Sequence, residues 1–110
     1  GVVRRGEGPG MAGLGPGVAA SLLTRDLHRR IQPVLMTLAP GARHANEVGH
    51  AGEEVVYLLA GTLVLRVDAM EVALAAGDTA YYPSALAHAY FNPGPLEAVL
   101  LTIGTPPKPV

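Results

Sequence analysis

Two histidines and one glutamate are the residues of this chain whose types and spacing suggest chemistry. His50 and Glu54 stand in one segment with the composition of a β-strand, and His88 stands in a second such segment further along. Two imidazoles and one carboxylate can hold a divalent metal ion and leave coordination positions open to a small molecule. The three residues therefore predict a polar, metal-binding pocket.

The direction of these side chains follows from the alternation along a strand, where residues an even number apart share a face. His50 and Glu54 share a face only if the intervening Ala51-Gly52 stays extended. Glu54 also shares its face with Val56. A carboxylate that faces an apolar interior is costly unless it is paired or bound to a cation. A bound metal would remove that cost; the alternative is an ordinary carboxylate at the mouth of a barrel.

Three more residues are candidates for contact with a ligand or for proton donation. His88 shares its face with Tyr90, so both are expected to point inward. Tyr57 and Arg43 are the other side chains near the expected pocket that could donate a proton or anchor a substrate. Each of the three could instead pack in the core or lie on the surface. Likewise, His88 could be a hydrogen-bonded core histidine and His50 a loop residue.

The composition indicates a single globular domain and excludes several functions. The chain has 110 residues, of which 49% are apolar and 15% charged, with 14 glycines and 10 prolines to form tight turns. The formal net charge of −1 argues against a nucleic-acid-binding surface on this chain. No apolar run approaches the roughly 20 residues of a membrane span. The absence of cysteine excludes disulfides and thiolate metal sites, and it is compatible with the cytoplasmic location that we expect.

The order of strand-like and turn-like segments predicts an all-β domain. Residues 1–17 are rich in glycine and proline and lack a hydrophobic period, so we expect a flexible arm or linker there, followed by a barrel domain over residues 18–110. Short strand-like runs in that domain alternate with turns, and these runs are 19–24, 31–38, 55–59, 63–67, 71–74, 79–82, 88–91 and 97–103. About eight or nine such strands without a helical period favour a closed barrel with room for one small ligand.

One segment resembles the second sequence motif of the cupin family. It runs from Gly77 through Pro83 and His88 to Asn92 with the spacing of that motif. It departs only at Ala85, where the family often has glycine.

The first cupin motif is matched by His50, Glu54 and Gly61. Together the two motifs extend the resemblance over roughly residues 31–103. The resemblance implies the cupin double-stranded β-helix, a jelly-roll barrel. It also implies that His50, Glu54 and His88 are metal ligands.

One position departs from the first motif in a way that concerns the metal site. Cupins usually carry two histidines separated by one residue there, and the first of these positions is Val48 in this chain. His44 lies four residues earlier, in a segment that reads as a loop. The resemblance therefore implies three protein ligands for iron, manganese, nickel or zinc. Val48 would line the ligand site in place of the missing histidine.

A finer resemblance concerns the sensor domains that follow a helix-turn-helix domain in bacterial transcriptional regulators. It rests on short flanking segments, which are Pro40-Gly41, Gly52-Glu53-Glu54, Asn92-Pro93-Gly94 and Thr105-Pro106-Pro107. In that subgroup the first histidine of the first motif is frequently absent. The resemblance implies a barrel that binds a small molecule with the metal as its anchor. Because nothing before Val18 could form a helix-turn-helix, DNA binding would belong to another domain.

Two alternatives to the sensor remain open. The chain could be a mononuclear metal-dependent enzyme of the dioxygenase, isomerase or epimerase type, because two histidines and a carboxylate resemble the facial triad of iron oxygenases. It could also be a structural cupin whose pocket has lost its metal, which Val48 would favour. The fold does not decide among them.

The low content of charged residues also predicts self-association. With only 15% charged residues, an exposed apolar patch is expected, and a homodimer would cover it. The strand-like run from Ala19 to Thr24 could reach across to the partner.

Overall fold

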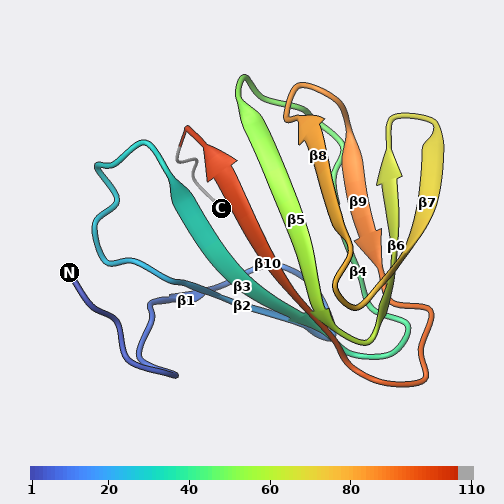
Figure 1. The fold of residues 1–110 in the computed structure, drawn as a ribbon, viewed down its shortest axis with the longest axis horizontal. Helices are drawn as coiled ribbons and strands as arrows, with labels where there is room; N and C mark the ends of the chain where they lie inside the picture. Colours follow the sequence, from blue (N-terminus) through green and yellow to red (C-terminus); the bar gives the residue numbers. More distant parts are fainter. Residues whose placement is uncertain (107–110) are drawn as a thin grey trace.

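The computed structural model describes residues 1–106, which form ten β-strands and no helix (Figure 1). The strands are β1 (Gly10–Met11), β2 (Val18–Leu22), β3 (Gln32–Leu38), β4 (Arg43–Asn46), β5 (Glu53–Ala60), β6 (Thr62–Val67), β7 (Met70–Ala75), β8 (Thr79–Pro83), β9 (His88–Phe91) and β10 (Ala98–Thr105). Within these described residues there is accordingly no helix long and apolar enough to cross a membrane.

The strands form two antiparallel sheets that pack against each other. One sheet has six strands in the order β1-β2-β3-β10-β5-β8, and the other has four in the order β4-β9-β6-β7. Strand β10, near the C-terminus, pairs with both β3 and β5, so segments far apart in sequence lie side by side (Figure 1). Two facing antiparallel sheets without helices are the architecture of a jelly roll. The predicted all-β fold is confirmed.

The core lies between the two sheets and is built by alternate residues of each strand. In β3 the buried residues Val34, Met36 and Leu38 alternate with partly exposed ones, and β5 follows the same pattern. The buried apolar side chains of the core cluster include Met36, Leu38, Val56, Leu58, Leu63, Leu65, Leu74, Ala98 and Leu100. Because successive side chains on a strand point to opposite faces, this period-2 burial fixes which polar residues also face inward.

Asn92 links the turn after β9 to the end of β3 through hydrogen bonds of its side chain. Its buried side-chain amide donates from Nδ2 to the carbonyl oxygens of Leu38, at 2.9 Å, and Leu96, at 2.8 Å. Its Oδ1 accepts a hydrogen bond of 2.7 Å from the backbone N–H of Gly94. One side chain therefore satisfies three backbone groups and joins the two sheets near the end of the barrel.

One segment differs from the sequence expectation in its secondary structure. Arg43 and His44, expected in a loop, lie in β4, where they pair with Phe91 and Tyr90 of β9. The four residues of β4 include no β-branched residue, so their local preference for a strand is weak. The expectation was wrong because the pairing with β9 is a tertiary interaction that local sequence does not reveal.

The N-terminal segment also takes part in the sheet. Residues 1–17, expected as an arm or linker, contain β1, which pairs with β2. Strand β2 in turn pairs with β3 of the same chain, so the run expected to reach a partner lies in the chain's own sheet. The end of the expected barrel domain, residues 107–110, lies outside the described residues, and Pro107 of the flanking segments lies there with it.

Candidate metal and ligand site

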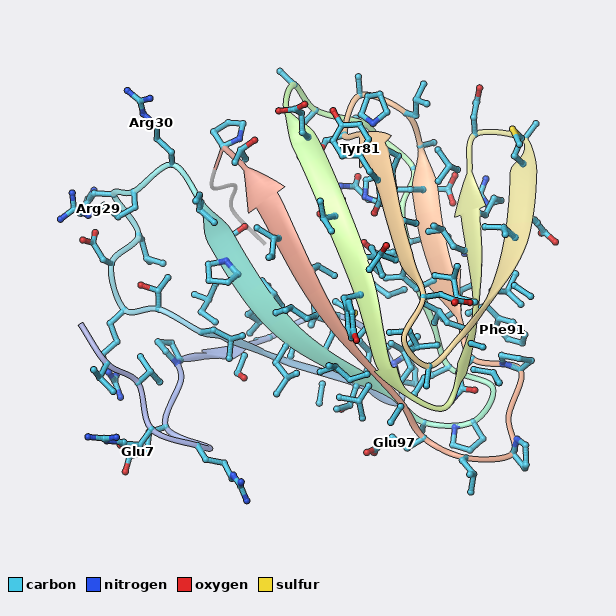
Figure 2. All side chains as sticks on the ribbon, in the orientation of Figure 1. Glu7, Arg29, Arg30, Tyr81, Phe91 and Glu97 are labelled. Atoms are coloured by element: carbon cyan, nitrogen blue, oxygen red, sulfur yellow. The ribbon has the colours of Figure 1, made fainter. Side chains whose placement is uncertain are left out.

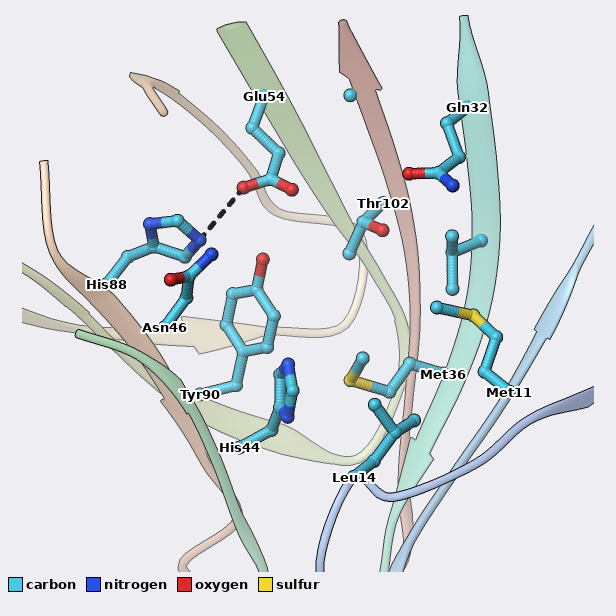
Figure 3. A pocket seen from close by; sticks show the side chains of 12 residues that line it. Met11, Leu14, Gln32, Met36, His44, Asn46, Glu54, His88, Tyr90 and Thr102 are labelled. Carbon is cyan, nitrogen blue, oxygen red and sulfur yellow. Dashed lines mark ion pairs between the residues drawn. The ribbon is translucent and has the colours of Figure 1, made fainter. Parts of the chain in front are cut away.

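A cavity of about 50 Å³ lies between the two sheets, enough for a few water molecules (Figure 3). Its polar wall comes from strands of both sheets and consists chiefly of Gln32, His44, Asn46, Glu54, His88 and Tyr90. Thr102 adds a hydroxyl from β10, and Met11, Leu14 and Met36 add apolar surface. The cavity thus brings acidic, imidazole, amide and phenol groups together in one small space.

Glu54 is the carboxylate of this cavity. The alternation along β5 turns Glu53 outward and Glu54 inward, where Glu54 is only 5% exposed. Its Oε2 lies 3.1 Å from Nε2 of His88 and accepts a hydrogen bond of 2.9 Å from the hydroxyl of Tyr82. A buried carboxylate needs such partners because burial without them is costly. The expected inward direction of Glu54 is seen in the structure.

Tyr82 and Tyr90 form a chain of hydrogen bonds that ends on Glu54. Their hydroxyl oxygens are 2.6 Å apart. Because Tyr82 donates its single proton to Oε2 of Glu54, Tyr90 must donate to Tyr82. Burial, and after it the neighbouring charges, raises the pKa of both phenols well above the ordinary range, so both keep their protons at neutral pH. These two hydrogen bonds orient the carboxylate of Glu54 and leave the hydroxyl oxygen of Tyr90 as an acceptor.

His88 is held in the tautomer that suits a metal ligand. Its Nδ1 lies 2.9 Å from the carbonyl oxygen of Leu86, and since a carbonyl only accepts, Nδ1 carries the proton. In the neutral ring, Nε2 then has a lone pair and faces Oε2 of Glu54 at 3.1 Å. Two acceptor atoms this close repel each other unless a cation joins them. That positive partner is either a proton held between the two atoms or a metal ion.

The geometry of the pair fits a metal ion. Two ligand atoms about 2.1 Å from one metal and about 90° apart are roughly 3.0 Å from each other. Nε2 of His88 and Oε2 of Glu54 are 3.1 Å apart. Metal-bound histidines commonly donate the other ring N–H to a carbonyl, as His88 does to Leu86. The pair therefore fits two positions in the coordination shell of a metal.

His50 lies near this pair, but its ring is further from His88 than a shared metal would place it. Its backbone N–H donates to the carbonyl of Ser84 at 2.9 Å, and its Nδ1 donates to the carbonyl of Ala51 at 3.0 Å, which leaves Nε2 as an acceptor. Its ring centroid is 6.5 Å from that of His88, whereas two imidazoles on one metal lie about 5 Å apart. Accordingly, residues 1–106 contain no group of three or more His, Cys, Asp or Glu placed to hold a metal.

The backbone before β5 explains the position of His50. Gly52 has a φ of +127°, and a Cβ added there would lie 1.6 Å from the carbonyl oxygen of Thr105. Only glycine fits this close approach. The carbonyl of Gly52 also accepts a hydrogen bond of 3.0 Å from the N–H of Ser84. These contacts tie the segment that carries His50 to two neighbouring parts of the chain.

The sequence model of the cupin domain family matches residues 34–104. This chain belongs to the cupin family. Among curated proteins none matches the chain.

Solved structures share the cupin fold of this chain. The cupin domain of an XRE family transcriptional regulator from Enterobacter cloacae is 20% identical, with a TM-score of 0.76, over 84% of this chain and 99% of that chain. A protein from Thermus thermophilus is 29% identical, with a TM-score of 0.75, over 86% and 90%. A predicted oxalate decarboxylase from Thermotoga maritima is 23% identical, with a TM-score of 0.81, over 96% and 98%. The cupin recognition made from the two motifs is confirmed.

His44 and Asn46 line the cavity of this cupin and were missed as site residues by sequence reasoning. They lie one residue apart on β4, opposite Tyr90 and His88 of β9, and both line the cavity. The first cupin motif usually has two histidines separated by one residue. His44 and Asn46 have the same separation on β4, and both side chains line the cavity. Two polar residues at alternate positions could have indicated that both face the cavity. This alternation was not used because residues 43–46 were not predicted to form a strand.

Gln32, Thr102 and Tyr82 were also missed. Gln32 and Thr102 are buried and lie in phase with buried apolar residues of the same strands, Val34 and Leu100. Tyr82 is buried on β8 and bonded to Glu54. A polar residue at an inward position of an apolar strand is the signal that would have found all three.

Three residues expected at the ligand site do not line this cavity. Val48 is 82% exposed in the segment between β4 and β5. Tyr57 occupies an outward position of β5 and is 38% exposed. Arg43 is exposed on β4 and pairs with Glu47 at 3.3 Å. For Arg43 and Tyr57 this follows from the strand register, since odd-numbered residues of β4 and β5 point away from the cavity, whereas Val48 lies outside both strands.

Proposed function

We propose that this cupin domain binds a small molecule in its cavity, next to a divalent metal ion held by Glu54, His88 and His50. The observation that carries the proposal is the close approach of Nε2 of His88 and Oε2 of Glu54, which lie 3.1 Å apart in the cavity wall. Imidazole and carboxylate suit iron, manganese, nickel or zinc. His50, whose Nε2 is also left as an acceptor, would supply the third ligand when its segment brings the ring nearer.

The cavity wall limits the chemistry of the ligand. A volume of about 50 Å³ admits a ligand of only a few non-hydrogen atoms unless Met11 and Leu14 move aside. The described wall includes Gln32, Asn46 and Thr102 as hydrogen-bonding groups but no lysine or arginine. A carboxylate or phosphate ligand would therefore need the metal as its positive partner. The metal, when bound, would polarise a ligand oxygen and anchor it.

A sensor role for this binding domain is supported by the likeness to the cupin domain of the XRE family regulator. In this proposal, binding of a small molecule to the barrel changes the activity of a DNA-binding domain elsewhere in a cytoplasmic regulator. The net charge of −1 on this chain agrees with a division of labour in which the barrel itself does not bind DNA.

Metal loading followed by ligand binding tests the proposal. The purified chain is stripped with a chelator, and titration with Mn²⁺, Fe²⁺, Ni²⁺ and Zn²⁺ is expected to give one equivalent bound. Acetate, glycolate and ethylene glycol, which are small enough for the cavity, then serve as probes in calorimetry of the loaded protein. Saturable binding of a probe that remains unchanged chemically supports the sensor. No metal bound below about millimolar concentration would overturn the proposal.

A metal-dependent enzyme is the second candidate, and the chain of hydrogen bonds from Tyr90 through Tyr82 to Glu54 favours it. Such a chain beside a metal could hold or pass on a proton during a reaction. Conversion of a probe by the metal-loaded domain, absent from the stripped domain, would decide for the enzyme. Binding without conversion would decide for the sensor.

Removal of the Tyr82 hydroxyl is expected to weaken metal binding. In Tyr82→Phe, Oε2 of Glu54 loses the hydrogen bond that orients it, and the loss of such an outer partner raises a metal dissociation constant by about 10- to 100-fold. Competition with a metal-binding dye at fixed pH measures the change.

Tyr81→Phe provides the matched control for this prediction. Tyr81 precedes Tyr82 on β8 but faces outward, where its hydroxyl donates to Glu53. Its loss should leave the metal affinity unchanged. Equal affinities of the two variants would show that Tyr82 does not act on the metal site.

A further inference from the structure

The charged residues of this chain are unevenly distributed along its length. Residues 1–31 hold five arginines but only one glutamate and one aspartate, which gives them a formal charge of +3. Residues 32–110 hold three basic and seven acidic residues, which gives a charge of −4. The net charge of −1 therefore conceals a basic part of the molecule.

The structure gathers this basic part at one end of the molecule. The segment before β1 and the segment 23–31 between β2 and β3 lie side by side. A hydrogen bond of 2.6 Å from Nη2 of Arg25 to the carbonyl oxygen of Glu7 joins them. In Figure 2, Glu7, Arg29 and Arg30 lie at the same end, away from β6 and β7. The positive charge is thus concentrated on two neighbouring segments outside the barrel.

A hollow of about 520 Å³ lies between these two segments. The residues that line it come from both segments and are Gly1, Val2, Val3, Thr24, Arg25, Asp26, Leu27 and His28. Sites for small molecules commonly have volumes of about 300–1,000 Å³. The hollow therefore has the size of a ligand site, and it is separate from the smaller cavity between the sheets.

Part of the wall of this hollow is apolar and open to water. Val2 is 73% exposed and Leu27 is 53% exposed, and both line the hollow from opposite segments. Removal of such apolar surface from water is favourable. A hydrocarbon group placed between Val2 and Leu27 would cover both side chains, so this part of the wall suits an apolar chain.

The other part of the wall is cationic. The hydrogen bond of Arg25 to the carbonyl of Glu7 orients its guanidinium without neutralising it, because a carbonyl oxygen carries no net charge. Asp26 also lines the hollow, but its carboxylate accepts hydrogen bonds from the backbone N–H of His28, at 3.1 Å, and from Nε of Arg29, at 2.7 Å. Since Arg29 balances the charge of Asp26, Arg25 leaves the hollow positive. A guanidinium is well suited to bind a carboxylate or phosphate group.

We propose that this hollow is a second ligand site, which binds an amphiphilic anion. The carboxylate or phosphate of the ligand lies at Arg25, and its hydrocarbon chain lies along Val2 and Leu27. A nucleic-acid backbone would match the arginine but would leave the apolar wall in water. The proposal does not rest on the metal site. A free amphiphile and an anionic membrane lipid share this chemistry, and the experiment distinguishes these two sources.

Calorimetric titration of the chelator-stripped chain with octanoate tests the proposal. Octanoate is too large for the cavity of about 50 Å³ between the sheets, and without metal the result does not depend on the proposed metal site. One equivalent is expected to bind with a dissociation constant below about 1 mM. Acetate, which lacks the chain, and octanol, which lacks the charge, should each bind at least about tenfold more weakly.

Two variants and a control assign the binding to the hollow. Arg25→Gln and Leu27→Gln should each raise the dissociation constant of octanoate at least about tenfold. Leu27→Gln leaves the hydrogen bond of Arg25 to Glu7 in place, so it changes the wall without removing the contact that joins the two segments. Arg43→Gln removes the same charge from β4 of the other sheet and should change the dissociation constant by less than about twofold. Circular dichroism confirms that each variant is folded.

Flotation with phospholipid vesicles distinguishes the two sources of the ligand. Binding to phosphatidylglycerol vesicles but not to phosphatidylcholine vesicles, weakened by both variants, would assign a membrane lipid to the hollow. Binding of octanoate without binding to vesicles would assign a free amphiphile. The proposal is overturned if neither octanoate nor the anionic vesicles bind, or if Arg43→Gln weakens binding as much as Arg25→Gln.

Discussion

Replacement of Glu54 by glutamine is expected to weaken the binding of Mn²⁺ or Zn²⁺ by more than about 100-fold, beyond the loss typical of outer partners. The substitution removes the negative charge from the cavity wall and leaves His88 without its 3.1 Å carboxylate partner. Because the amide has nearly the shape of the carboxylate, packing in the core should change little. Calorimetric titration of the chelator-stripped protein measures the dissociation constant.

Glu53→Gln is the control, because Glu53 is adjacent in sequence but faces outward and accepts a hydrogen bond from Tyr81. It removes the same charge from the chain and should leave metal affinity within about twofold, since exposed charges act weakly at a distance. If Glu54→Gln binds metal as tightly as the unmodified chain, the metal site is not where we propose it.

Removal of the Asn92 side chain is expected to destabilise the fold by about 3 kcal/mol, because a buried backbone group that loses its partner costs about 1–3 kcal/mol. Asn92→Ala leaves the buried carbonyl of Leu38, and the partly buried carbonyl of Leu96 and N–H of Gly94, without this partner. Urea unfolding followed by circular dichroism gives the change in the free energy of unfolding.

Asn46→Ala is the comparison for that experiment. The amide of Asn46 lies in the cavity wall and does not link a turn to a neighbouring strand as that of Asn92 does. Its loss should change the free energy of unfolding by no more than about 0.5 kcal/mol. A similar loss for both variants would mean that the three hydrogen bonds of Asn92 do not set its contribution.

The period-2 pattern along single strands was enough to predict the direction of several site residues. Glu54 is flanked at even spacing by aliphatic residues that had to face the core, and Tyr90 follows His88 by two positions. The structure has all three of these side chains in the cavity wall. This part was predictable because alternation is a local property of the extended backbone.

The shape of the rest of the site depends on contacts between segments far apart in sequence. His44 and Asn46 face the cavity only because β4 pairs with β9, and Tyr82 meets Glu54 only because β8 pairs with β5. Neither pairing leaves a mark in the residues of β4 or β8 alone. Propensity is a weak guide where packing against a neighbouring strand decides the conformation.

By itself, then, the sequence determined the fold class, the family and the inward positions of Glu54, His88 and Tyr90, since these follow from local alternation and motif spacing. Only the tertiary structure decided that Val48 is exposed and that His50 stays 6.5 Å from the ring of His88. Both residues lie in the segment before β5, and its position depends on contacts with other strands. One such contact is the close approach of Gly52 to the backbone of Thr105. Distances of that kind are set by packing between elements, which no local pattern encodes.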